Sequence, residues 1–181
     1  MKSSFKRQGS FFSAIFRKIF GGENFFLGKY EHPNGGSLTF APSIPGHVEH
    51  RQLSNNSLNV MAGCFLACTP GVNIKAKFGG LKAFFSGEGA FLLEASGSGD
   101  LFFNSFGGIV KKEINGEFIV DTGHVVAFDS SLNYSITGMG NFKSTMLSGE
   151  GLVMKFKGAG TLYLQTRNVS SVASWLTPRL L

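Results

Sequence analysis

Apolar and polar positions alternate along much of the chain with the two-residue period of β-strands. In Leu101–Phe103 and again in Leu162–Leu164, the outer two residues lie on one face and the middle residue on the other. Glycine-rich stretches interrupt these segments and supply the positive φ angles of tight turns or bulges. Short strands with turn signals roughly every ten residues favour an all-β sandwich, barrel or β-helix. Helical spacing occurs in one stretch, at Phe12, Ile15, Phe16, Ile19 and Phe20.

A β-rich unit of about 60 residues recurs along the sequence. The tetrapeptide Ser-Gly-Glu-Gly at 86–89 returns intact at 148–151. Each copy then leads to a Gly-x-Gly marker, at 97–99 in the first and 158–160 in the second. The sequence therefore predicts strand pairs that are separated by glycine turns and arranged in the same order twice.

A second match lies upstream of these turns, where residues 58–68 resemble residues 118–128 at an offset of 60. A weaker copy at 20–40 keeps only the second half of a unit. We expect a single domain built of a partial first repeat with a basic aromatic N-terminus, a second repeat, and a third repeat with a C-terminal tail, at 1–55, 56–115 and 116–181. The open edge of the incomplete first repeat needs cover from elsewhere in the chain or from another chain.

Composition agrees with strands, because the 181 residues include 25 Gly and 20 Phe, and 43% are hydrophobic. Glycine punctuates short strands, and phenylalanine suits a half-buried pleated surface. The two cysteines, Cys64 and Cys68, would stand on one strand face roughly 13 Å apart, beyond disulfide reach. Together with the lack of a long apolar run and of a signal-peptide pattern, this predicts a cytoplasmic protein.

The net charge of +6 belongs to the N-terminus. Five of the 17 Lys and Arg residues precede the first acid, Glu23, which leaves 12 bases against 11 acids in the rest of the chain. A nearly neutral body gives no reason to expect nucleic-acid binding. The candidate interaction surface consists of the basic residues Lys6, Arg7, Arg17 and Lys18.

Two interpretations of the basic start stay open. Residues 2–20 could form an amphipathic helix on an anionic membrane or a mitochondrial presequence, which would give a membrane-peripheral or mitochondrial location. Alternatively, the segment is a connection packed on its own sheet, because the equivalent stretches at 80–85 and 141–147 also carry lysine before apolar residues.

The remaining motifs predict no enzyme, no metal and no cofactor. The glycine turns lack the Gly-Lys-Ser/Thr spacing of a phosphate loop, and Glu88 and Glu150 would repel a phosphate. His47 and His50 have the wrong spacing to share a strand face, and they sit in a proline-rich connection. His124 occupies the repeat position of Cys64, where we expect a partly buried, hydrogen-bonded ring.

Several stretches resemble, in order, a known family over residues 16–168: Phe40-Ala41-Pro42, Phe65-Leu66-Ala67 with Pro70-Gly71-Val72, Gly123–Phe128, Leu147–Leu152 and Gly158–Thr166. The chain resembles a bacterial-type member of the mitochondrial-biogenesis family named for altered inheritance of mitochondria. The resemblance implies a double-stranded β-helix like that of the tryptophan RNA-binding attenuation protein, with pseudo-threefold repeats and homo-oligomers, a trimer being favoured. Typical members have an N-terminal strand region before the glycine-rich stretch, whereas this chain starts late.

The leading hypothesis is a non-enzymatic, oligomeric β scaffold whose turns and edges form an interaction surface. The first alternative is a membrane-associated protein that uses the basic aromatic N-terminal segment. The second is RNA binding by analogy of fold, which the nearly neutral body disfavours.

Overall fold

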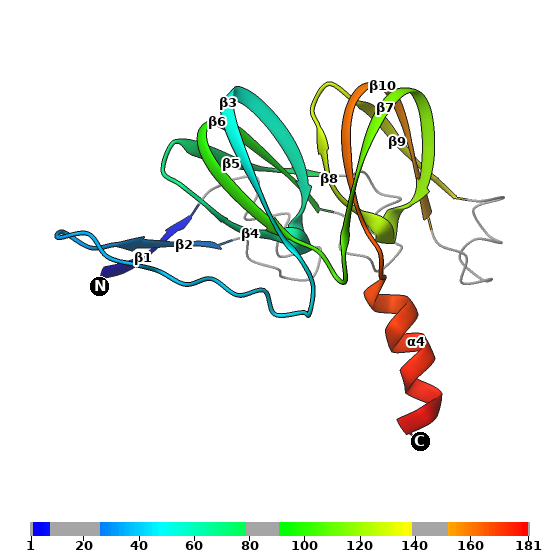
Figure 1. Cartoon of the computed structure of the whole chain (residues 1–181), viewed down its shortest axis with the longest axis horizontal. Helices are drawn as coiled ribbons and strands as arrows, with labels where there is room; N and C mark the ends of the chain where they lie inside the picture. Colours follow the sequence, from blue (N-terminus) through cyan, green and yellow to red (C-terminus); the bar gives the residue numbers. More distant parts are fainter. Residues whose placement is uncertain (1, 8–25, 79–90, 139–151, 181) are drawn as a thin grey trace.

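The computed structural model describes residues 2–7, 26–78, 91–138 and 152–180. In this part of the chain nearly every element is a β-strand, which confirms the all-β prediction. Figure 1 shows two curved β units side by side, a separate ribbon on one side of them and a single helix that extends from the other. The likeness to a double-stranded β-helix is not tested by this arrangement and stays a prediction.

The two units contain the same elements in the same order. Each has a long strand, a short 3₁₀ turn, two short strands and a second long strand. The first β unit consists of β3 (Val48–Met61), η1 (Ala62–Cys64), β4 (Phe65–Cys68), β5 (Val72–Phe78) and β6 (Phe91–Asn104). The second β unit consists of β7 (Ile109–Asp121), η2 (Thr122–His124), β8 (Val125–Asp129), β9 (Asn133–Gly138) and β10 (Leu152–Gln165).

Antiparallel pairing of the two long strands forms the backbone of each unit. In the first unit β3 runs against β6 from Val48, opposite Asn104, to Met61, opposite Leu92. In the second unit β7 pairs with β10 over its whole length. The other side of β6 holds β5 and then β4, as the other side of β10 holds β9 and then β8. The boundaries predicted at 56 and 116 fall inside β3 and β7, because each unit begins with the upstream half of its long strand.

The Gly-x-Gly markers lie within the long strands, and this corrects the prediction that they separate strand pairs. Gly97 and Gly158 have φ angles of +116° and +123°, yet β6 and β10 continue through them. A side chain at Gly97 would place its Cβ 2.4 Å from the carbonyl oxygen of Gly71, so only glycine fits there. Residues of positive φ bend a strand locally, and Figure 1 shows that the long strands of both units are curved.

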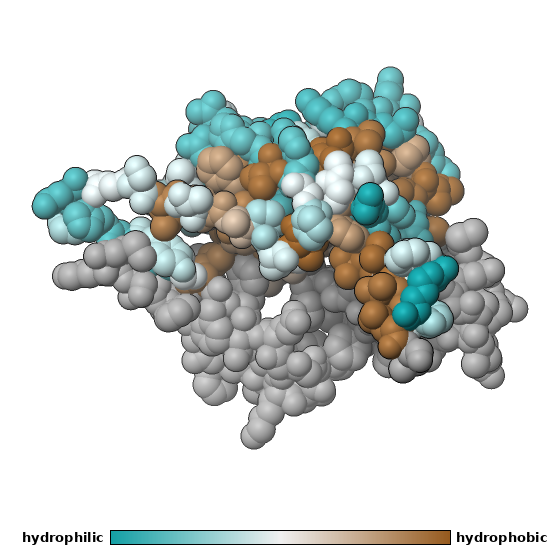
Figure 2. All heavy atoms as spheres, turned by 60° about the horizontal axis from the view of Figure 1, so that its bottom comes forward, coloured by the Kyte–Doolittle hydropathy of each residue, from teal (hydrophilic) through white to brown (hydrophobic). Residues whose placement is uncertain are grey.

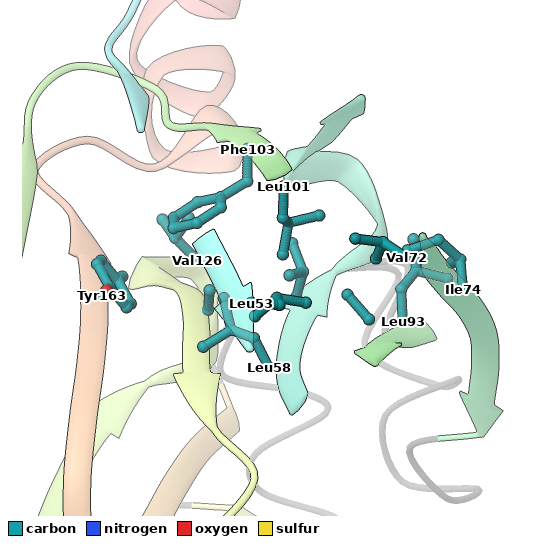
Figure 3. Packing of buried hydrophobic residues seen from close by; sticks show 12 residues of the cluster. Leu53, Leu58, Val72, Ile74, Leu93, Leu101, Phe103, Val126 and Tyr163 are labelled. Carbon is teal, nitrogen blue, oxygen red and sulfur yellow. The ribbon is translucent and has the colours of Figure 1, made fainter. Parts of the chain in front are cut away.

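Two buried clusters form the core, and each takes residues from both units. Leu101 and Phe103 of β6 pack in the first cluster with Tyr163, which comes from β10. The rings of Phe103 and Tyr163 meet edge to face with 5.1 Å between their centroids. Figure 3 shows these side chains converging with Leu53 and Val126 between the units. The second cluster likewise includes Leu92 of the first unit.

A short strand pairing joins the two units into one eight-stranded antiparallel sheet with the order β4-β6-β3-β8-β10-β7, to which β5 and β9 add along β6 and β10. In this junction Leu58 of β3 pairs with Asp129 of β8, and Val60 pairs with Ala127. The junction is the only strand pairing between the units among the described residues.

Elements at the two ends of the chain were not foreseen from the sequence. β1 (Lys2–Arg7) and β2 (Phe26–Glu31) form a separate antiparallel ribbon. The predicted C-terminal tail contains the helix α4 (Val169–Leu180), capped by the side chain of Asn168, which accepts a hydrogen bond from the amide of Ser170. The stretch with helical spacing, residues 12–20, lies outside the described residues.

Candidate interaction surfaces

The junction between the units is held by side chains as well as by strand pairing. Arg51 of β3 reaches across to the second unit, where it donates hydrogen bonds to the hydroxyl of Tyr163 at 2.9 Å and to Asp129 Oδ1 at 3.4 Å. Asp129 Oδ2 accepts a further hydrogen bond from the amide of Thr161 at 2.8 Å. Asn59 donates from its amide to Ser130 Oγ at 3.3 Å. Polar contacts of this kind set the register of a strand pair.

The second unit exposes the same stretch that the first unit buries in the junction. By the offset of 60, residues 118–120 of β7 correspond to residues 58–60 of β3. Asn59 is 4% exposed in the junction, whereas Ile119 at the equivalent position is 55% exposed. Among the described residues β7 pairs only with β10, so its other edge has no strand partner there.

The first unit exposes the complementary half of the junction. Residues 67–69, at the end of β4 and just after it, correspond to residues 127–129 of β8. Ala127 and Phe128 are completely buried, whereas Ala67 and Cys68 are only partly buried. Within the described chain β4 pairs only with β6, at the opposite end of the sheet order from β7. The molecule therefore presents both halves of its own internal junction, one on each unit.

The residues that make the polar side-chain contacts of the junction, Arg51 and Asp129, are replaced at these two edges. Upstream of the irregularity at Ser54–Asn56 in β3 the offset is 61, so Lys112, opposite Leu162, stands at the position of Arg51, opposite Leu101. Its ammonium lies 4.9 Å from the centroid of the Phe118 ring. Thr69 stands at the position of Asp129, and its hydroxyl accepts the amide of Asp100 at 2.8 Å, as Asp129 accepts that of Thr161. The local backbone support is thus preserved, while the ion pair of Arg51 with Asp129 has no counterpart between these two edges, because Thr69 carries no charge.

The predicted basic surface is only partly described. Lys6 and Arg7 lie in β1, opposite Leu27 and Phe26 of β2. Arg17 and Lys18 lie outside the described residues, so a surface formed by all four residues stays a prediction. The use of residues 2–20 at a membrane stays a prediction.

His50 of β3 makes a surface contact that the sequence did not indicate. His50 lies in β3 and not in a proline-rich connection, which corrects the prediction. Its Nε2 is 2.8 Å from Asp100 Oδ1 of β6, and its ring stacks on Phe102 with 5.0 Å between centroids. Pairing with β6 creates this contact between residues 50 positions apart, so sequence analysis could not reveal it. No group of three His, Cys, Asp or Glu residues that could hold a metal occurs in the described ranges.

His124 has a structural environment. It closes η2, is partly buried as the sequence predicts, and its Nδ1 lies 2.8 Å from the carbonyl oxygen of Gln165. The side-chain amide of Gln165 in turn donates to the carbonyl of Gly123 at 2.7 Å. The ring therefore helps to tie η2 to the end of β10, and the partner recorded for it within the described ranges is a carbonyl oxygen and not a carboxylate that could orient a general base.

The cysteines lie in different elements, since Cys64 closes η1 and Cys68 ends β4, which corrects the expectation of one strand face. Both thiols are free. Burial raises the pKa of the Cys64 thiol to about 12 and also raises the pKa of Cys68. A thiol that stays protonated at neutral pH is a poor nucleophile and a poor metal ligand.

A hollow near the start of α4 offers little to a ligand. The amide of Phe106 at its wall already donates to Gln165 Oε1, and that of Gly108 donates to Thr166 Oγ1, each at 2.9 Å. The amide of Gly107 donates to the carbonyl of Pro45. Its lining consists of Pro45, Gly46, Phe106, Gly107, Gly108, Thr166 and Arg167.

The sequence and the fold were compared with those of known proteins. The family described as Mitochondrial biogenesis AIM24 matches residues 1–167. An uncharacterized protein of Streptococcus pyogenes serotype M6 is 32% identical over 171 residues, which cover 93% of this chain and 69% of the relative. A crystal structure of a Streptococcus pyogenes protein from a structural genomics programme superposes with a TM-score of 0.73 and 26% identity. That match covers 99% of this chain and 82% of the other.

Proposed function

The chain belongs to the Mitochondrial biogenesis AIM24 family, and from its two open sheet edges we propose that it is a non-catalytic β scaffold that assembles head to tail with further copies. In this assembly β7 of one copy takes the place that β3 has in the internal junction. The β4 strand of the next copy takes the place of β8.

The observation that carries the proposal is the matched exposure of the two edges. Val120 of one copy would meet Ala67 of the next, as Val60 meets Ala127 within the chain. Burial of the partly exposed Phe118 and Val120 and of the exposed Ile119 would remove apolar surface from water, and strand pairing would satisfy the backbone groups of both edges. The chain itself thus supplies the template for the contact.

Such a contact joins two different surfaces, so it closes into a ring when the rotation between copies divides a full turn. A trimer is our working number, in line with the pseudo-threefold arrangement that the family resemblance implies. A scaffold of this kind functions without catalysing a reaction. The protonated thiols and the structural role of His124 support a non-catalytic function.

Two variants that each block one edge test the proposal. Ile119→Lys places a charge in the β7 edge, and Ala67→Lys places one where Ala127 is completely buried in the junction. Each variant alone should run as a monomer in size-exclusion chromatography with light scattering. An unpaired charge buried at the contact weakens association by about a hundredfold or more. A matched control is Val110→Lys, on the same strand and similarly exposed but outside residues 118–120; it should keep the wild-type mass.

Mixing the two blocked variants distinguishes the head-to-tail arrangement from any symmetric one. Each variant retains one intact edge of opposite type, so the mixture should form dimers of one Ile119→Lys chain and one Ala67→Lys chain. A monomeric wild type, or an Ala67→Lys chain that still associates with itself, contradicts the proposal.

A further inference from the structure

The C-terminal helix α4 carries an apolar stripe that the described residues leave uncovered. Val169, Val172, Leu176 and Leu180 follow one another at spacings of three and four, so they lie along one face of the helix. All four are exposed, and α4 has no buried residue. Figure 1 shows the helix extending away from the sheet, and Figure 2 shows hydrophobic surface along it.

The rest of the helix has a composition typical of helices that lie in a membrane interface. Its opposite face consists of small hydroxyl side chains, Ser170, Ser171, Ser174 and Thr177, and it contains no acidic residue. Trp175 flanks the stripe with 58% of its surface exposed, and the guanidinium of Arg179 lies 4.4 Å from the centroid of its ring. Tryptophan and arginine side chains are amphipathic and are favoured at the boundary between headgroups and acyl chains.

Charge decides between a lipid surface and a second copy of the helix. Arg167 and Arg179 are the only charged residues from Gly158 to Leu180. Packing of two such stripes would bring together cations with no acid on either helix, whereas anionic headgroups supply the missing counter-charge. A helix of 12 residues with Pro178 in its last turn is also marginal in water, so it gains most from a surface that covers its apolar face.

We propose that α4 binds an anionic lipid surface, with Val172, Leu176 and Leu180 inserted at the acyl boundary and Arg179 at the headgroups. Among the described residues no helix has the length and apolarity needed to span a membrane. The helix would therefore lie in the interface as a peripheral contact. This contact is independent of the β7 and β4 edges, because it uses neither unit of the sheet.

Trp175 is the only tryptophan in the chain, so its fluorescence reports on α4 alone. The full chain is titrated with small vesicles of phosphatidylcholine mixed with phosphatidylglycerol. We expect the emission to shift to the blue and iodide quenching to fall. The affinity should decrease on vesicles of phosphatidylcholine alone, because each arginine near an anionic surface contributes about a fivefold factor.

Two double variants compare the apolar stripe of α4 with its opposite face by introducing the same residue, glutamine, on each. Val172→Gln with Leu176→Gln should weaken vesicle binding by about tenfold for each apolar side chain lost. Ser171→Gln with Ser174→Gln changes the opposite face and should keep the wild-type affinity. Circular dichroism checks that both double variants retain the sheet, as expected because α4 has no buried residue.

Three results would overturn the proposal. The first is the absence of any emission shift with vesicles, and the second is an equal loss of affinity in both double variants. The third is an emission shift that appears with rising protein concentration in the absence of vesicles, which would place a second copy on the stripe. The Ala67→Lys variant should show the wild-type emission shift, so failure of edge assembly and failure of lipid binding are distinguishable.

Discussion

The first and second β units share their elements, but equivalent residues in the two units are packed with different tightness. At Gly97 of the first unit a Cβ would lie 2.4 Å from a backbone carbonyl oxygen, whereas at Gly158 of the second unit the nearest atom would be 3.4 Å away. At the junction positions the difference has the same sense for the long strands: β3 is covered by β8, whereas one edge of β7 has no strand partner among the described residues. Equivalent sequence positions therefore keep the same backbone path while their surroundings diverge with their place in the sheet.

The largest expected effect comes from the paired glycines. Gly97→Ala combines an unfavourable positive φ angle with a clash against fixed backbone, and we expect a loss of about 3–5 kcal/mol in the free energy of unfolding. Gly158→Ala meets the unfavourable φ angle alone and should lose about 1–2 kcal/mol. Urea unfolding of the two variants measures the difference. Equal losses would mean that the first unit relaxes around Gly71 and that the close approach has no energetic consequence.

These glycines also show what the sequence could predict. The repeated Gly-x-Gly at 97–99 and 158–160 correctly indicated equivalent places in two units, because a positive φ angle needs the same residue type in each copy. Their position inside a continuous strand was not predictable, since a glycine with positive φ serves a turn and a mid-strand bend equally well. The upstream halves of β3 and β7 were missed for a different reason: apart from their alternation, their residues differ between the copies.

The candidate surfaces were less predictable than the fold. Arg51 and Asp129 are 78 residues apart, and only the junction of β3 with β8 brings them together. No local pattern encodes such a partner. The helix α4, in contrast, left a readable signal in the Asn168 cap and the spacing of Val169, Val172 and Leu176. Its serine-rich face and Pro178 resemble a polar tail, and this concealed a helix whose apolar face has no partner among the described residues.

A second, smaller difference in stability should distinguish β3 from β7 at the equivalent positions of Arg51 and Lys112. Arg51→Gln removes the bonds to Tyr163 and Asp129, which are partly screened by solvent, and should destabilise the protein by about 1–2 kcal/mol. Lys112→Gln at the equivalent position removes only an exposed contact with the ring of Phe118, and its effect should stay below about 0.5 kcal/mol. Thermal unfolding followed by circular dichroism compares them. A Lys112→Gln effect as large as that of Arg51→Gln would show that β7 is as firmly clasped as β3.

A pH-dependent difference is expected at the end of the 3₁₀ turns, where the first unit has Cys64 and the second has His124. Burial raises the pKa of the Cys64 thiol from 9.0 to about 12 in the folded chain. Above pH 9 the unfolded chain releases this proton and the folded chain retains it, so the contribution of the thiol to stability is complete below pH 9 and is lost as the pH rises toward 12. The slope is about 1.4 kcal/mol per pH unit at most. Cys64→Ala removes this slope, whereas other groups that titrate at high pH affect both proteins alike.

The free energy of unfolding is therefore measured in urea at pH 8 and at pH 10.5 for the wild type and for Cys64→Ala. We expect the wild type to lose more stability between these two pH values than Cys64→Ala does. Equal losses would mean that the Cys64 thiol is open to solvent and that the first unit is no tighter than the second at this turn.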